Sequence, residues 1–214
     1  MTKECPILFS APMVRAILDS RKTQTRRIAK VTDKDCKPGM ITPLAGFVPR
    51  TIANHISYCP YGKQGDRLWV RETFGIGYKD GEGGYSAIPW TGSIPSKDGK
   101  IFFRADFNEN KNDAILPWKP SIHMPRWASR ILLEITGVRV ERLQDISECD
   151  AKAEGSYVCD YFSRRLLDQS SNQGCYKWGY RSIWESLNGS GSWDLNPWVW
   201  VVEFKTLEIA RAAA

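Results

Sequence analysis

The feature that most constrains the fold is a long alternation of apolar and polar residues from Ile131 to Leu143. Period-two alternation is typical of a β-strand with one buried face, and a strand of this length needs partners in a sheet. Gly137 interrupts the pattern, so we expect a bulge or bend there. A second apolar strand, which its composition places in the centre of a sheet, is predicted at 197–204. Shorter strands are predicted at 67–74 and 101–105.

Three short helices are predicted. The segment 10–19 begins with Ser-Ala-Pro, a helix start, and continues with apolar residues at helical spacing. The segment 147–155 begins with a capping-box pattern and ends with glycine. A third helix is predicted at 180–187, where Asn-Gly follows the last apolar residue.

The stretches between these elements are irregular in sequence. Residues 28–63 and 156–175 have the composition of loops, and 75–100 are rich in glycine, which predicts a mobile insertion. Because strands separated by irregular stretches outnumber helices, the predicted class is α+β, mainly β: an antiparallel or mixed β-barrel decorated by short helices. A chain of 214 residues fits one elaborated domain or two small ones.

The sequence also argues against several classes of protein and cofactor. No apolar run approaches the ~20 residues of a membrane-spanning helix, and the first residues lack a secretory signal, so we expect a cytoplasmic protein without a membrane partner. The six cysteines form no Cys-x-x-Cys pair and the two histidines lie far from any cysteine pair, so we expect reduced thiols and no metal site. The motifs G-x-G-x-x-G and the phosphate-loop lysine are missing, and no cofactor is predicted.

The excess of positive charge is concentrated in the first third of the chain. Residues 1–75 contain 13 Lys and Arg against 6 Asp and Glu, whereas 76–214 contain 17 against 18. The densest cluster, at 21–27, has the sequence Arg-Lys-Thr-Gln-Thr-Arg-Arg. With many aromatic residues available for stacking, this pattern favours nucleic acid or a nucleotide as partner. The alternative is a solvated basic surface.

The basic cluster contains a candidate nucleophile and a candidate base. Lys22 and Thr25 lie three residues apart, and neighbouring cations lower the pKa of a lysine until its neutral amine can accept a proton. Such an amine within hydrogen-bond distance would activate the hydroxyl of Thr25. The alternative is that both are ordinary surface residues at a helix end.

Glu154 stands out because its position is unfavourable for a carboxylate. It precedes Gly155 in the last turn of the predicted helix, where the helix dipole disfavours an anion by about a few tenths of a kcal/mol. A carboxylate there either pairs with a cation elsewhere, for which the Lys22 cluster is the candidate, or transfers protons. The alternative is a solvated glutamate.

Two further segments, 69–72 and 123–130, place arginine beside aromatic residues. Arginine in this setting can pair with phosphate and stack on a base, whereas the alternative places the tryptophans in the core. The candidates for substrate binding in these segments and in the basic cluster are Arg21, Arg26, Trp69, Arg71, Glu72, His123, Arg126 and Arg130.

Three blocks of the chain, at 6–27, 61–72 and 143–155, resemble the ASCH domain family, and in particular its larger phage and prophage members. The family signature G-x-K-x-x-T is matched at Lys22 and Thr25, although Ser20 and Arg21 replace the glycine-led form. The resemblance implies a PUA-like β-barrel, related to RNA-binding domains, that forms a single domain over 1–214. It also implies that 75–120 and 156–196 are insertions.

Short members of this family include an amidohydrolase that removes the acetyl group from N4-acetylcytidine. The resemblance implies that its Lys, Thr and Glu correspond to Lys22, Thr25 and Glu154, with the first as base, the second as nucleophile and the third as proton donor. The predicted function is therefore hydrolysis of an N4-acylated cytidine-type nucleoside or base, without a cofactor. The alternative is a non-catalytic module that binds RNA, DNA or a modified base and uses Lys22 and Thr25 to hold phosphate.

Overall fold

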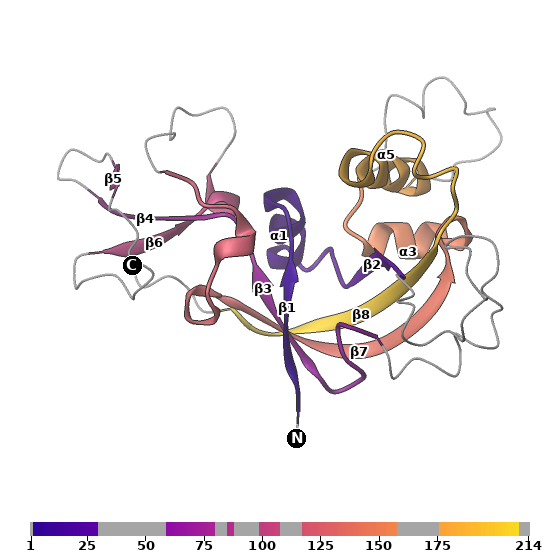
Figure 1. Cartoon of the computed structure of the whole chain (residues 1–214), viewed down its shortest axis with the longest axis horizontal. Helices are drawn as coiled ribbons and strands as arrows, with labels where there is room; N and C mark the ends of the chain where they lie inside the picture. The colour runs from indigo at the N-terminus through magenta and orange to yellow at the C-terminus, as the bar shows by residue number, and fades with distance from the viewer. Residues whose placement is uncertain are drawn as a thin grey trace, which may run out of the picture. The chain divides into compact units, whose positions relative to one another are not determined.

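A computed structural model of the chain describes residues 2–29, 59–79, 85–87, 99–107, 117–157 and 176–209 (Figure 1). It is a mixed α and β structure with more strand than helix. The chain divides into two compact units, which are described separately below. Unit 1 comprises Met1–Ser20, Asp66–Glu134 and Lys205–Ala214, and unit 2 comprises Arg21–Gly65 and Ile135–Phe204.

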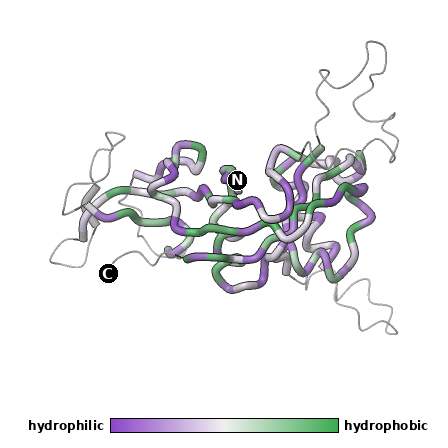
Figure 2. Tube along the Cα trace, turned by 90° about the horizontal axis from the view of Figure 1, so that it is seen from below, coloured by the Kyte–Doolittle hydropathy of each residue, from purple (hydrophilic) through white to green (hydrophobic). Residues whose placement is uncertain are grey.

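The larger sheet has five strands in the order β1-β3-β7-β8-β2. β1 (Glu4–Leu8) pairs in parallel with β3 (Arg67–Arg71), and β3 pairs antiparallel with β7 (Ile131–Arg142). β2 (Gln24–Ile28) pairs antiparallel with β8 (Trp198–Ile209). Figure 2 shows both hydrophobic and hydrophilic stretches along the strands, as expected for a sheet with one buried face.

Unit 1 contains a second sheet in addition to its share of the first. This sheet has the order β5-β4-β6, with β4 (Phe74–Lys79) in the centre between β5 (Tyr85–Ala87) and β6 (Lys100–Phe103). One core cluster of unit 1 consists of Phe74, Ile76, Phe103, Met124 and Ala128. The helices among the described residues of unit 1 are α1 (Ala11–Leu18), η3 (Arg104–Asp106), η4 (Ser121–His123) and η5 (Arg126–Ala128).

Unit 2 contains α3 (Glu148–Ala153), α5 (Tyr176–Asn188) and the short η6 (Leu143–Asp145). Ser147 caps α3, since its hydroxyl accepts a hydrogen bond from the amide of Asp150 at 3.0 Å. The core of unit 2 lies among α3, α5, η6 and the first half of β8, and consists of Leu143, Ile146, Ala151, Tyr180, Trp184, Trp193, Val199 and Val201.

The strongest local patterns of the sequence are confirmed. The alternation at 131–143 forms β7, and the segment 197–204 belongs to the longer β8, which is an interior strand. The helices at 10–19 and 147–155 are present as α1 and α3. The helix predicted at 180–187 is also present, but it begins four residues earlier.

Three predictions in unit 1 differ from the structure. The strand predicted at 67–74 is broken at Glu72 and Thr73, because Phe74 pairs with Phe103 in the second sheet. The glycine-rich segment 75–100 includes strand residues among those described: it contains most of β4 and all of β5, and Gly75 and Gly77 pair with Phe102 and Lys100 of β6. The strand predicted at 101–105 also ends at Phe103, where η3 begins.

Neither sheet closes within the described ranges: β1 and β2 are the edges of the larger sheet, and β5 and β6 are the edges of the smaller one. A closed barrel is therefore not observed there. Most of the predicted loops at 28–63 and 156–175 lie outside the described residues. The organisation of the chain as one domain with two insertions stays a prediction.

Candidate functional site

Lys22 reaches the interior of unit 2 through a turn that follows α1. Ser20 adopts a left-handed backbone conformation, with φ of 57°, in the place where the family signature has glycine, the residue that adopts this conformation most readily. After this turn, Lys22 forms an isolated antiparallel bridge with Glu154, and the amide of Thr23 donates to the carbonyl of Ala153 at 2.8 Å. The backbone thus fixes Lys22 beside the end of α3.

Glu154 is the C-cap residue of α3. Its amide donates to the carbonyl of Asp150 at 2.8 Å, and the chain then leaves the helix through Gly155, whose φ is 80°. A glycine at this position permits the left-handed turn that ends many helices. Local signals thus end α3 at Glu154 and fix the backbone there.

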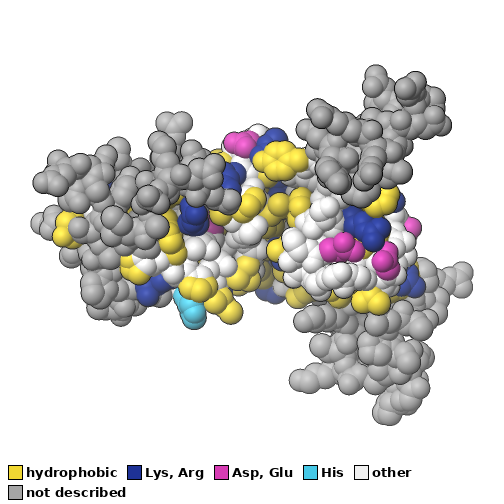
Figure 3. Space-filling view, turned by 90° about the horizontal axis from the view of Figure 1, so that it is seen from above, with side chains coloured by type: hydrophobic (Ala, Val, Ile, Leu, Met, Phe, Trp, Pro, Cys, Tyr) yellow, Lys and Arg dark blue, Asp and Glu magenta, His cyan; other side chains and the backbone are white. Residues whose placement is uncertain are grey.

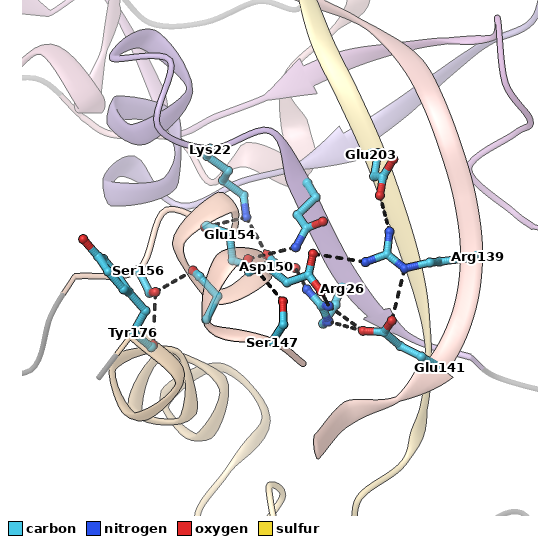
Figure 4. A network of polar contacts seen from close by, with 12 residues as sticks. Lys22, Arg26, Arg139, Glu141, Ser147, Asp150, Glu154, Ser156, Tyr176 and Glu203 are labelled. Carbon is cyan, nitrogen blue, oxygen red and sulfur yellow. Dashed lines mark hydrogen bonds and ion pairs between the residues drawn. The ribbon is translucent and has the colours of Figure 1, made fainter. Parts of the chain in front are cut away.

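The central contact of the site joins Lys22 and Glu154 (Figure 4). The Lys22 Nζ donates to Glu154 Oε2 at 2.7 Å and to the Glu154 carbonyl at 2.9 Å. Both residues are only 3% exposed. The second carboxylate oxygen of Glu154 accepts from Arg26 Nη1 at 3.1 Å. Glu154 thus has two different cations on its two oxygens.

Burial lowers the pKa of Lys22 below its ordinary value of 10.5. The attraction and hydrogen bond of Glu154 oppose this effect, and the positive charges of Arg27 and Arg26 add to it. The neighbouring cations on which the sequence argument relied do contribute, but removal of the ammonium from water is the larger cause. The neutral amine is the form that can accept a proton.

Arg26 connects the pair to a wider network of charges. Its side chain is fully buried and contacts three carboxylates: its Nε donates to Glu141 Oε1 at 2.9 Å, and its Nη2 lies 3.4 Å from Asp150 Oδ2, besides the bond to Glu154. Arg139 continues the network, since it contacts Glu141 at 3.1 Å, Asp150 at 3.3 Å and also Glu203. A guanidinium with these partners holds the carboxylates in place and is not open to a substrate.

None of the side-chain contacts of this network involves Thr25. Side chains alternate along a strand, and Gln24 and Arg26 both hydrogen-bond to α3 or its cap residue, so Thr25 lies on the opposite face of β2. It is 4% exposed, and its hydroxyl makes no hydrogen bond to the other described residues. The structure therefore brings Lys22 and Glu154 together but leaves Thr25 outside their contact.

Arg21 lies at the surface of unit 2. Its Nη2 donates to the hydroxyl of Tyr157 at 3.0 Å, and its Cζ lies 4.8 Å from the centre of the same ring. Lys and Arg side chains are not gathered into one patch on the face drawn in Figure 3, where some of them have Asp and Glu beside them.

No family model, no curated protein and no solved structure matches the chain. The site is therefore interpreted from its own geometry and from the resemblance of its motifs.

The described part of the chain has neither a membrane-spanning helix nor a cluster of metal ligands. Its longest helix, α5, has 13 residues, and none of its helices has the length and hydrophobicity needed to cross a bilayer. It also contains no group of three or more His, Cys, Asp and Glu residues placed to hold a metal ion.

The remaining predicted site residues belong to unit 1 and form two clusters. In the first, the ring of Trp69 has the Cζ atoms of Arg71 and Arg126 at 5.4 and 6.0 Å from its centre. Arg71 donates to the carbonyl of Ile122, and Arg126 donates to Glu4 at 3.0 Å. His123 is exposed in η4.

The second cluster is an ion network around Arg130. The guanidinium contacts Glu72 at 2.9 and 3.1 Å and Asp106 at 2.8 Å, and it lies over the ring of Phe103 at 4.0 Å. Burial raises the pKa of Glu72, and Arg130 limits that rise. These contacts indicate that Glu72 and Arg130 stabilise the junction of β3 and β4 and do not bind a substrate.

Sequence reasoning missed several residues of the unit 2 site. Tyr180 is buried with its ring centre 6.0 Å from Arg26 Cζ, and burial, with a smaller contribution from the Glu154 charge, raises the pKa of its hydroxyl well above 10. Asp150, Glu141 and Arg139 were also missed. The only sequence signal for any of them is the capping-box position of Asp150, because the others come from distant strands or from α5.

Proposed function

We propose that the chain is an amidohydrolase that acts on an N4-acylated cytidine-type nucleoside or base. The observation that carries the proposal is the buried contact between Lys22 and Glu154, at 2.7 Å, in which burial lowers the pKa of the lysine. An amine and a carboxyl group in this contact share protons, so one can accept a proton while the other donates one. Amide hydrolysis requires both transfers.

In the first half of the reaction, Lys22 is neutral and Glu154 is protonated. The Thr25 oxygen attacks the acyl carbon, and its proton passes to the Lys22 amine. The bond between the acyl carbon and the cytosine N4 then breaks, and N4 receives the Glu154 proton. The products of this step are an acyl ester on Thr25, a lysine ammonium, a glutamate carboxylate and the free amine.

In the second half, water replaces the amine. The Glu154 carboxylate accepts a proton from the water, whose oxygen attacks the ester carbon. Lys22 returns its proton to the Thr25 oxygen as the ester bond breaks. The acid is released, and Lys22 and Glu154 recover their starting proton arrangement.

The resemblance to the ASCH family supports the assignment of Thr25 as the nucleophile and of a PUA-like barrel as the fold. Thr25 is three residues from Lys22 in the sequence, and its hydroxyl makes no hydrogen bond to the other described residues. For the reaction, the Thr25 hydroxyl must come within about 3 Å of Lys22 Nζ. The alternative of a phosphate-holding module has less support, because an ammonium that is 3% exposed and bonded to a carboxylate is poorly placed to meet phosphate.

The test is incubation of the pure chain with N4-acetylcytidine, followed by chromatography for cytidine. We expect release, and we expect Lys22→Met, Glu154→Gln and Thr25→Ala each to lower kcat by about 10²- to 10⁴-fold, the usual contribution of a general acid, base or nucleophile. Thr25→Ser should retain part of the activity. Arg181→Gln, on the surface of α5, is the matched control. The proposal fails if no acylated cytidine is cleaved, or if activity persists in Lys22→Met.

A further inference from the structure

The side of β3 in unit 1 that faces away from the core carries the half-buried ring of Trp69, with two arginines near it. Along β3, Leu68 and Val70 are buried, so Trp69 and Arg71 lie on the opposite side of the strand. The neighbouring β1 places Pro6 opposite Trp69 and Leu8 opposite Arg71, and Leu8 is 40% exposed. We call this side, together with the adjoining η4 and η5, the Trp69 surface.

The two guanidinium groups nearest to Trp69 are weakly committed to other partners. Arg71 donates from Nη2 to the carbonyl of Ile122, but its Nε has no hydrogen-bond partner, and it makes no ion pair with the described residues. Arg126 pairs with Glu4, but both side chains are more than a third exposed. An ion pair that is exposed to water contributes little to the free energy of unfolding. Both groups lie within the distance of the Trp69 ring at which a cation and an aromatic face attract each other.

The Trp69 surface also carries a surplus of positive charge. Its described members include Arg67, Arg71 and Arg126, and the one carboxylate among their ion partners is Glu4. The adjoining pair of Lys205 and Glu134, at 2.9 Å, is neutral as a whole. Exposed apolar side chains lie in the same part of unit 1: Ile122 in η4 is 60% exposed, and Trp127 in η5 is 38% exposed.

From this combination we propose that the Trp69 surface binds single-stranded nucleic acid. An indole ring and planar guanidinium groups offer flat faces to a base, and the same guanidinium groups offer paired donors to phosphate. A single strand presents both partners, because its base faces are exposed beside its phosphates. A duplex keeps its bases stacked inside, and an acidic peptide has charges but no flat ring for Trp69.

This inference is independent of the proposed function. All residues of the Trp69 surface belong to unit 1, whereas Lys22, Thr25 and Glu154 belong to unit 2. Failure of the amidohydrolase assay would leave the binding proposal intact, and the reverse also holds.

The experiment measures fluorescence anisotropy of a labelled single-stranded RNA of about 12 nucleotides, within the size range of single-strand binding surfaces. The full chain is titrated at several salt concentrations, and a duplex of the same length and a poly-glutamate peptide are titrated in parallel. We expect the single strand to bind more tightly than either competitor, with an affinity that falls as salt rises.

Variants locate the binding site. Trp69→Leu should weaken binding about tenfold, because one stacked base is lost. Arg71→Gln should reduce the slope of the logarithm of the binding constant against the logarithm of salt concentration by about the contribution of one phosphate contact. Glu4→Gln removes the carboxylate and should strengthen binding a few-fold. The matched control uses another exposed tryptophan and arginine pair, Trp178 and Arg181 of α5, whose ring centre and Cζ lie 5.5 Å apart. Trp178→Leu and Arg181→Gln should leave the affinity within about twofold.

Three outcomes would overturn the proposal. The first is no binding of the single strand at low salt. The second is equal binding of the duplex or of the peptide. The third is unchanged affinity in Arg71→Gln and Glu4→Gln, two variants that retain every core side chain and therefore test the surface even where Trp69→Leu disturbs folding.

Discussion

Replacement of Lys22 by methionine should lower the free energy of unfolding by about 3 kcal/mol. The methionine fills most of the volume of the lysine but leaves the Glu154 carboxylate, which is 3% exposed, without its 2.7 Å partner. Removal of one member of a buried pair costs about 3–5 kcal/mol. Because Arg26 still contacts the other oxygen of Glu154 at 3.1 Å, we expect the lower end of that range.

Urea denaturation measures this loss, followed both by tryptophan fluorescence and by far-ultraviolet circular dichroism. With a slope of about 2 kcal/mol per M, a loss of about 3 kcal/mol moves the midpoint by about 1.5 M. The variant Glu154→Gln should also be destabilised. The double variant should lose less than the sum of the two single losses, since neither partner is then left alone; a coupling of at least about 1 kcal/mol is expected for residues in direct contact.

The control is Arg181→Gln, which removes contacts of 3.5 Å to Glu185 and Asp194 at the surface of the same unit. Such a change should cost less than about 0.5 kcal/mol. The argument is refuted if Lys22→Met is as harmless as Arg181→Gln, or if the losses of Lys22→Met and Glu154→Gln simply add.

Two further outcomes follow from the structure. Since the pKa of Lys22 is lower in the folded chain than its ordinary 10.5, the folded chain binds fewer protons between these two values, and the free energy of unfolding should rise with pH across that window. Urea titrations at a series of pH values should show this rise in the unaltered chain and a smaller rise in Lys22→Met; an identical pH dependence would contradict the lowered pKa. Gly179→Ala should destabilise the chain by about 1–3 kcal/mol despite the better helix propensity of alanine, because the added Cβ would lie 2.1 Å from the Tyr157 carbonyl oxygen. A higher thermal midpoint for this variant would mean that the contact relaxes freely.

Local patterns in the sequence were sufficient to predict β7 and the start of α3. The alternation in 131–143 requires only the pleat of a strand, and the cap at Ser147 requires only the amide of Asp150 three residues later. The unfavourable position of Glu154 at a helix end also directed attention to Lys22 as a cationic partner, and the two side chains are in contact. Their roles in catalysis stay predictions.

The misplaced boundaries depend on residues far away in the chain. At the first described residue of α5, the amide of Tyr176 donates to the carboxylate of Glu148 on α3 at 2.8 Å. This contact comes from a residue 28 positions away, so the sequence of 176–188 alone does not show it. The break after β3 has a similar cause, since Glu72 is held by Arg130 across 58 residues.

The buried contacts of Arg26 with three carboxylates could not be predicted from the sequence. Arg26 was assigned to substrate binding because it belongs to a basic cluster, yet its guanidinium is buried against Glu154, Glu141 and Asp150. This position has a consequence for Lys22. If the Lys22 proton leaves the pair instead of passing to Glu154, Glu154 becomes a buried anion without its ammonium partner, at a cost of several kcal/mol by the general behaviour of buried ions. With Arg26 on its second oxygen, the carboxylate retains a cation when the lysine loses its charge. The lowered pKa of Lys22 and the burial of Glu154 are therefore compatible because a third charged residue, on the same face of β2 as Gln24, keeps the carboxylate paired in both states of the lysine.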